Sequence, residues 1–281
     1  GFCLVGSEMC IRDRYMKVLS NLMIKQFIVL TMCMILVCIA GDLSANKGLE
    51  IAILSDKNND GFIDSSSTMT MNLINKRGDV VTRKLRFKRL EVPTDGDKSI
   101  AIFESPRDVK GVAILSYAHK VEADDQWLYL PALKRVKRIA SKNKSGPFLG
   151  SEFSFEDFSF QEVEKYEYLY LDEEIYLNNP CYVIERKPLD PYSGYTKQLV
   201  WIDKENYLVQ KIHHFDRKSF HLKTQLFKDY RKYDGFFWQP HEIEMINHQN
   251  GKKSILIFDD VKLKSGFTDK DFSQNSLKRS R

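Results

Sequence analysis

Along most of the chain, apolar and polar residues alternate in short runs, which is the period of a β-strand buried on one face. Residues 68–73 (TMTMNL) alternate in this way, and residues 80–90 return after the turn-forming stretch 75–79 (NKRGD), so this region predicts a hairpin. Further segments of the same kind follow, separated by short turns rich in Asn, Asp, Gly and Pro. They are residues 99–104, 111–119, 126–130, 166–171, 181–186, 197–202, 208–215, 221–230, 236–246 and 253–263.

Two segments depart from the strand pattern. Residues 47–54 (KGLEIAIL) have apolar residues at helical spacing, so we expect one short helix before the strands begin. Residues 141–164 are rich in Gly, Ser, Phe and acidic residues, and we expect a loop with one or two helical turns that lies over the sheet. The pattern as a whole predicts a mainly β fold with minor α: one meandering antiparallel sheet, curled or closed so that its edges are protected.

The N-terminal region has the parts of a secretory signal peptide. The apolar run 27–40 (FIVLTMCMILVCIA) follows Lys17 and Lys25 and precedes small residues, and it is shorter than the ~20 residues that cross a bilayer. We expect residues 16–45 to be this signal, cleaved after Ala45 or else after Ala40, with an uncleaved anchor as the alternative. Residues 1–15 contain CLVGSEMCIRDR, which resembles a translated sequencing adapter. Residues 46–281 are then expected to form a single exported domain.

Composition narrows the function classes. The chain has 43 Lys and Arg against 38 Asp and Glu, a net charge of +5 that gives no basis for nucleic-acid binding. Beyond residue 45 Cys181 is the only cysteine, so this domain contains no disulfide and depends on apolar burial. We expect Cys181 to be a packing residue and the protein to be a monomer.

The motif search gives no catalytic signature and no cofactor site. G-x-S-x-G, Walker A and H-E-x-x-H are all absent. The nearest metal motif is residues 56–64 (DKNNDGFID), which place Asp56, Asn58, Asp60 and Asp64 as in an EF-hand loop. Its twelfth position is Ser67 instead of the bidentate Glu of a calcium loop, so a plain turn is the favoured interpretation.

A basic run and a Phe-rich run are the candidate binding elements. In residues 133–139 (LKRVKRI), Arg135 and Arg138 are the candidate rim residues; the run is either a solvated edge strand or a basic rim for an anionic headgroup or an acidic partner. The aromatics of residues 151–160 must be buried, either as a permanent cap on the sheet or as a movable lid. A sheet face that is incompletely covered becomes an apolar pocket suited to acyl chains. The candidate cavity and lid residues are Trp127, Tyr129, Leu149, Phe153, Phe155 and Phe158.

Five strings carry a resemblance to a known family. They are residues 105–111 (SPRDVKG), 124–139 (DDQWLYLPALKRVKRI), 145–158 (SGPFLGSEFSFEDF), 193–203 (SGYTKQLVWID) and 271–279 (DFSQNSLKR). The chain from about residue 48 to residue 280 resembles the outer membrane lipoprotein-sorting proteins, which are LolA-like carriers. The resemblance implies an incomplete antiparallel β-barrel covered by short helices and loops. It also implies a periplasmic carrier of lipids or lipoproteins between membranes, often beside an RND-type exporter.

Three function classes follow. The leading hypothesis is a non-enzymatic periplasmic carrier that binds lipid or lipoprotein acyl chains on the concave face and contacts membranes transiently. The second is a lipid hydrolase that uses the same cavity, with a carboxylate activating water. The third is an accessory module of a transporter that has a solid core. The carboxylates considered for the hydrolase are Asp124, Asp125, Glu152 and Asp157.

Overall fold

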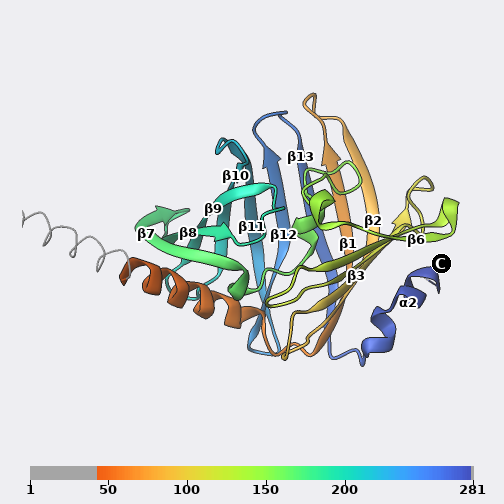
Figure 1. Ribbon diagram of the computed structural model, residues 1–281, viewed down its shortest axis with the longest axis horizontal. Coiled ribbons are helices and arrows are strands. Elements are labelled where there is room, and N and C mark those ends of the chain that lie inside the picture. Colours follow the sequence, from red (N-terminus) through yellow and green to blue (C-terminus); the bar gives the residue numbers. More distant parts are fainter. Residues whose placement is uncertain (1–42, 280–281) are drawn as a thin grey trace, which may run out of the picture. The chain divides into compact units, whose positions relative to one another are not determined.

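The computed structural model describes residues 43–279, and their strands form one antiparallel sheet (Figure 1). Its order is β6-β5-β4-β3-β2-β1-β13-β12-β11-β10-β9-β8-β7. The first six strands are β1 (Asp64–Ile74), β2 (Val80–Leu90), β3 (Lys98–Ser105), β4 (Ala113–Tyr117), β5 (Asp125–Leu130) and β6 (Arg135–Arg138). The others are β7 (Tyr166–Tyr176), β8 (Asn179–Pro188), β9 (Tyr195–Asp203), β10 (Val209–Asp216), β11 (His221–Tyr233), β12 (Phe237–Asn247) and β13 (Lys253–Leu263).

The topology fixes the path of the long connection between β6 and β7. Every strand pairs with its neighbour in the chain, except that β1 pairs with β13 and that β6 and β7 are the two edges of the sheet. The sheet is therefore not closed into a barrel. Residues 139–165 must run from one edge to the opposite edge, and we call them the crossing loop. They contain three short 3-10 turns, η3 (Ser141–Asn143), η4 (Phe155–Phe158) and η5 (Val163–Lys165).

Alternation along the strands gives the sheet two apolar faces. In β3, Ala101 and Phe103 belong to one buried cluster, and Ile100 and Ile102 belong to another. We call the first face, which the crossing loop covers, the inner face. The other, outer face is covered at β3–β6 by the C-terminal segment with η6 (Asp269–Phe272) and α2 (Gln274–Arg279). Two covered faces explain how residues 43–279, whose single cysteine is free, bury their apolar side chains without a disulfide.

The N-terminal helix covers another part of the inner face. Residues 46–56 are helical, and Ile51 and Ala52 pack against Ile184 of β8 and Val200 of β9. The helix approaches β7 closely at Gly48, where an added Cβ would lie 2.8 Å from the backbone nitrogen of Tyr170. A short 3-10 turn, η1 (Lys57–Asn59), then leads toward β1.

The mainly β fold predicted from the alternation is confirmed. The hairpin predicted from residues 68–73 and 80–90 is present as β1 and β2, which pair in continuous register from Asp64–Leu90 to Ile74–Val80. β7 extends to Tyr176 beyond its apolar start, because its pairing with β8 uses backbone groups whatever the side chains are. The proposed adapter and signal peptide lie in or mostly in residues 1–42, outside the described residues. Within residues 43–279, no helix is long and apolar enough to cross a membrane.

Candidate functional site

An apolar cavity of about 1140 Å³ lies between the inner face and its cover. Its floor consists of inward side chains from β1, β2 and β7–β13, and its cover consists of the N-terminal helix and part of the crossing loop. Small-molecule sites typically have about 300–1,000 Å³, so this cavity is large enough for a lipid-sized ligand. Representative lining residues are Ile184, Val200, Ile202, Ile212, Phe227, Ile243, Leu256 and Phe258.

The protein itself fills the remaining part of the inner face. Residues 146–158 of the crossing loop, here called the plug loop, insert Phe148 and Phe153 beside Phe103 of β3. Phe148 is fully buried, and its ring centre lies 4.1 Å from that of Phe158 and 5.4 Å from that of Phe155. The plug loop thus occupies the space over β1–β5, and the open cavity extends mainly over β8–β13.

Hydrogen bonds attach the plug loop to both halves of the sheet. Arg83 of β2 donates from Nη1 to the Leu149 carbonyl at 2.7 Å, and Gln126 of β5 donates from Nε2 to the Phe155 carbonyl at 2.8 Å. On the far side, Asn247 at the end of β12 donates to Glu152. These contacts hold the plug loop against the inner face of the sheet.

The candidate binding residues occupy three different places. Phe153 and Phe158 line the cavity, whereas Leu149 and Phe155 pack within the plug loop. The expectation for Trp127 and Tyr129 needs correction, because both pack on the outer face with the C-terminal segment and neither lines the cavity. Alternate residues of β5 face opposite sides of the sheet, and Leu128 is one of those that reach the inner face. The sequence motif alone did not show which of the two alternating sets faces inward.

The basic run forms the edge strand β6. Arg135 is exposed, and Arg138 forms an ion pair with Asp125 of β5. Neither arginine lines the cavity. This placement agrees with a charged, solvated edge strand and separates these residues from the acyl-chain space.

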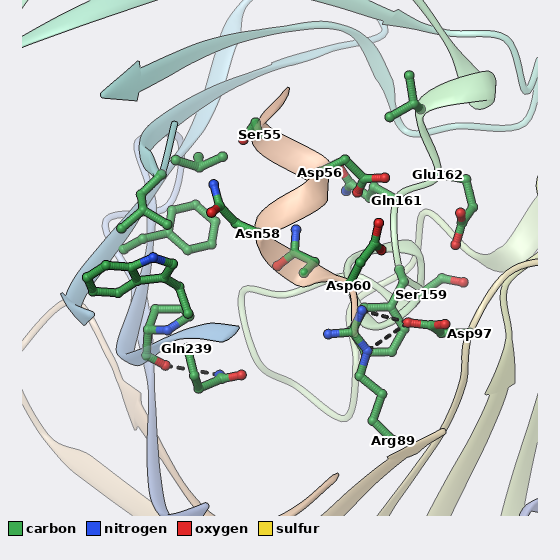
Figure 2. A pocket seen from close by; sticks show the side chains of 18 of the residues that line it. Ser55, Asp56, Asn58, Asp60, Arg89, Asp97, Ser159, Gln161, Glu162 and Gln239 are labelled. Carbon is green, nitrogen blue, oxygen red and sulfur yellow. Dashed lines mark hydrogen bonds and ion pairs between the residues drawn. The ribbon is translucent and has the colours of Figure 1, made fainter. Parts of the chain in front are cut away.

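The mouth of the cavity is polar and rich in carboxylates (Figure 2). Asp56 and Asp60 come from the end of the N-terminal helix and η1, and Glu162 comes from the crossing loop. Arg89 of β2 forms an ion pair with Asp97 at 2.6 Å. Burial, followed by repulsion between neighbouring carboxylates, raises the pKa of Asp56 to about 6 and that of Glu162 to about 7.

The EF-hand-like residues do not converge on one point. Asp56, Asn58 and Asp60 line the cavity, but the Asp64 carboxylate accepts hydrogen bonds from the backbone nitrogens of Ser265 at 2.7 Å and Gly266 at 3.1 Å. A strand begins at Asp64, where an EF-hand continues into a helix. Among the described residues, no group of three or more His, Cys, Asp or Glu side chains is arranged to hold a metal ion.

The carboxylates considered for hydrolysis already have partners. Asp124 forms an ion pair with Lys165, and Asp125 forms one with Arg138. Glu152 accepts from two asparagine amides, and Asp157 closes the capping box of η4 and accepts from the Tyr195 hydroxyl at 3.0 Å. Each of the four carboxylates therefore has a hydrogen-bond or ion-pair partner in the structure. Of the four, only Asp157 lines the cavity.

Sequence reasoning missed two contributors to the site. The helix of residues 47–54 was expected, but its role as a cover that places Leu49 and Ile53 in the cavity was not. The acidic mouth was also missed: Asp56 and Asp60 were considered only as part of an EF-hand-like loop, and Glu162 lies far from them in the chain. The alternation of apolar and polar residues in β8–β13 would have identified the residues of the cavity floor, but only if the set of positions that faces inward had been known.

Fold and cavity together define a class of protein: an open antiparallel half-barrel with an apolar cavity under a partial cover. A domain from Vibrio parahaemolyticus, assigned by its description to outer membrane lipoprotein sorting, is 49% identical, covering 84% of this chain and 100% of that one, with a TM-score of 0.82. The chain belongs to this family of outer membrane lipoprotein-sorting proteins. A family model described only as that of an uncharacterized protein matches residues 95–279.

Two further solved structures share the fold. A DUF1329 family protein from Desulfovibrio piger is 27% identical with a TM-score of 0.79, covering 83% of this chain and 99% of that one. A LolA superfamily protein from Nitrosomonas europaea is 21% identical with a TM-score of 0.66, at the same coverage, and shows the fold alone. No curated protein matches the chain.

Proposed function

We propose that this protein is a non-enzymatic periplasmic carrier that takes up the acyl chains of a lipid or lipoprotein and moves them between membranes. The observation that carries the proposal is the cavity of about 1140 Å³, which the plug loop leaves open beneath the N-terminal helix. Family membership supports the same conclusion, because the most similar of the structures described above is assigned to lipoprotein sorting. On this proposal the N-terminal segment directs export and is then removed.

Burial of an acyl chain is sufficient to drive binding. Each methylene that leaves water contributes about 0.8 kcal/mol, so a palmitoyl-length chain gains on the order of 10 kcal/mol before ordering costs. The floor of the cavity supplies aliphatic and aromatic contacts from six successive strands, β8–β13. Such a surface favours chain burial without requiring one particular polar contact.

The test combines lipid extraction with a variant that fills the cavity. Protein purified from cell envelopes is extracted and analysed by mass spectrometry, and we expect acyl-bearing molecules at near-stoichiometric amounts. Ile243→Trp places a large ring in the cavity and should abolish retention. Ile255→Trp is the matched control, because Ile255 pairs with Glu244 and lies on the opposite face from Ile243 and its partner Leu256. Protein that never retains or binds an acyl ligand contradicts the proposal.

We propose that the basic edge strand β6 is the surface that contacts a partner protein. Arg135 and Lys137 are exposed there, remote from the lining of the cavity, and the strand presents an unpaired edge that an RND-type exporter could contact. Arg135→Glu combined with Lys137→Glu should weaken association with the exporter in a crosslinking assay while leaving retained lipid unchanged. Loss of lipid in this variant would contradict the separation of the two surfaces.

A further inference from the structure

The mouth of the cavity has an excess of negative charge without bonding partners. Within residues 43–279, the carboxylates of Asp56, Asp60 and Glu162 have no hydrogen bond or ion pair. They differ in this from Glu91, which accepts from two backbone nitrogens, and from Asp97, which is paired with Arg89. Carboxylates that are partly desolvated and unpaired are costly unless a cation joins them.

Of the cations that line the mouth, Arg89 is already paired, whereas Lys57 and Lys120 form no ion pair with these carboxylates among the described residues. The Arg89 guanidinium bonds to Asp97 through Nε at 2.9 Å and Nη2 at 2.6 Å. Its Cζ atom also lies 4.2 Å from the ring centre of Phe62 and 3.8 Å from that of Phe160, so both faces are covered. Arg89 is therefore built into the wall and is not available to bind an anionic headgroup.

A second feature of the wall also points to a ligand. Ser159 is only 7% exposed and lines the cavity, yet its Oγ has no hydrogen-bond partner among the described residues. Figure 2 shows Ser159 on the side of the pocket where Glu162 and Asp97 lie. A buried hydroxyl without a partner gains a bond when a donor arrives, and an ammonium N–H is such a donor. The described residues offer no metal-binding group, so an organic cation fits this mouth better than a metal ion.

We infer that the mouth of the cavity recognises a positively charged amine at the head of the cargo, while the apolar floor holds the chain. This inference rests on the proposed carrier function and specifies its ligand class as an acyl- or alkyl-bearing amine. The ammonium would lie among Asp56, Asp60 and Glu162 and donate to them. A phosphate or carboxylate head would meet repulsion at the same place.

The charges around these carboxylates set the pH dependence. Glu162 faces Asp97, Asp56 and Glu164, with Lys120 as the opposing charge. Asp56 faces Asp60, Asp97 and Glu164, with Arg89 opposing. Burial raises the pKa of both groups, and acidic neighbours, which outnumber basic ones, raise it further, so both keep a proton to higher pH than usual. Cation binding must displace these protons, so the preference for an amine should be strong above about pH 7.5 and fade below about pH 6.

The test uses ligands that share one chain and differ in charge. Hexadecylamine, hexadecanol and palmitate are compared by displacement of the neutral fluorophore N-phenyl-1-naphthylamine from the purified full chain at about pH 7.5. We expect the amine to compete at least about tenfold more strongly than palmitate, with the alcohol between them. In Asp56→Asn combined with Glu162→Gln this gap should close.

A matched control removes the same charge elsewhere. Glu167→Gln combined with Glu205→Gln alters two exposed carboxylates outside the cavity, and the gap should persist. Equal competition by all three ligands in the unmodified protein, or a gap that survives the mouth variant, overturns the amine assignment alone. A protein that binds neither the fluorophore nor any of the three ligands overturns the carrier function itself.

Discussion

Glu152 of the plug loop accepts a hydrogen bond from Nδ2 of Asn247 at 2.7 Å, which joins the crossing loop to the end of β12. Asn250 donates to the same carboxylate at 3.0 Å, and the Glu152 backbone nitrogen donates to the Ser254 hydroxyl. Glu152 and Asn247 are both buried, so water does not readily replace the carboxylate as the acceptor for the Asn247 amide. One side chain therefore holds the plug against the strand pair that continues into the cavity floor.

Glu152→Ala should lower the free energy of unfolding by about 1–3 kcal/mol, because the buried Asn247 amide loses its acceptor and the exposed Asn250 amide loses a second bond. Chemical denaturation measures this change, and hydrogen exchange of the Phe148 amide, which bonds to the Phe153 carbonyl, reports opening of the plug loop. Glu122→Ala, at an exposed position, is the control and should leave both measurements unchanged. Unaltered exchange in Glu152→Ala would show that the plug is held by its aromatic contacts alone.

Phe148→Ala should cost about 3–5 kcal/mol, since it removes a fully buried ring from the centre of an aromatic cluster. The vacated space adjoins Phe153 and Phe158, which line the cavity, so the folded fraction should also accept a bulkier fluorophore. Thermal unfolding and fluorophore titration measure the two effects. Phe220→Ala, where the ring is 64% exposed, should change neither. A stability loss below about 1 kcal/mol would argue against the plug as part of the core.

Gly48→Ala tests how the N-terminal helix covers the cavity. On helix propensity alone the substitution would stabilise the helix by about 1 kcal/mol. The added Cβ, however, would lie 2.8 Å from the Tyr170 backbone nitrogen and 2.9 Å from the Leu169 carbonyl carbon. We expect the contact to dominate, so the helix shifts away from β7 and fluorophore affinity falls. Glu50→Ala, on the exposed side of the helix, should keep the affinity of the unmodified protein. Unchanged or tighter binding in Gly48→Ala would contradict this packing.

Glu156 gives a pH dependence whose sign can be derived. Burial, with repulsion from Asp157 as the next cause, raises its pKa from 4.5 to about 7. The folded state thus holds this proton more tightly than the unfolded chain does. The resulting stability is fully present below about pH 4.5 and is lost as the pH rises through 7. Across that window the loss should be on the order of 3 kcal/mol.

Comparison with Glu156→Gln isolates this contribution. Burial lowers the pKa of His213 to about 4 and that of His214 to about 3. Their contribution to the stability of the fold therefore has the opposite pH dependence and is lost as the pH falls below 6.5. Both histidines are present in the two proteins, so their contributions cancel when the free energies of unfolding are subtracted. Urea unfolding at several pH values should show the unmodified protein losing stability relative to Glu156→Gln as the pH rises. A difference that does not vary with pH would mean that Glu156 ionises as it does in water.

The alternation of side chains determined the strands, because each strand buries one face and the pattern of period two is local. Residues 80–90 and 253–263 were predicted with the bounds that β2 and β13 have. The five sequence strings that resemble the lipoprotein-sorting proteins indicated the family, and with it an incomplete barrel. The sequence also shows that the Phe-rich run lies between β6 and β7. It does not show that the run crosses the sheet, because that depends on β6 and β7 being its two edges.

Tertiary structure alone decided which parity of each strand faces inward, how far the plug fills the half-barrel, and which charges meet at the mouth. Trp127 and Tyr129 were placed in the cavity on residue type, yet they pack beneath Phe272 on the outer face. Asp56, Asp97 and Glu162 come together only because the helix, the β2–β3 connection and the crossing loop end at the same opening. A local pattern fixes the faces of a strand but not which face is enclosed, because that depends on pairing between distant segments such as β1 and β13.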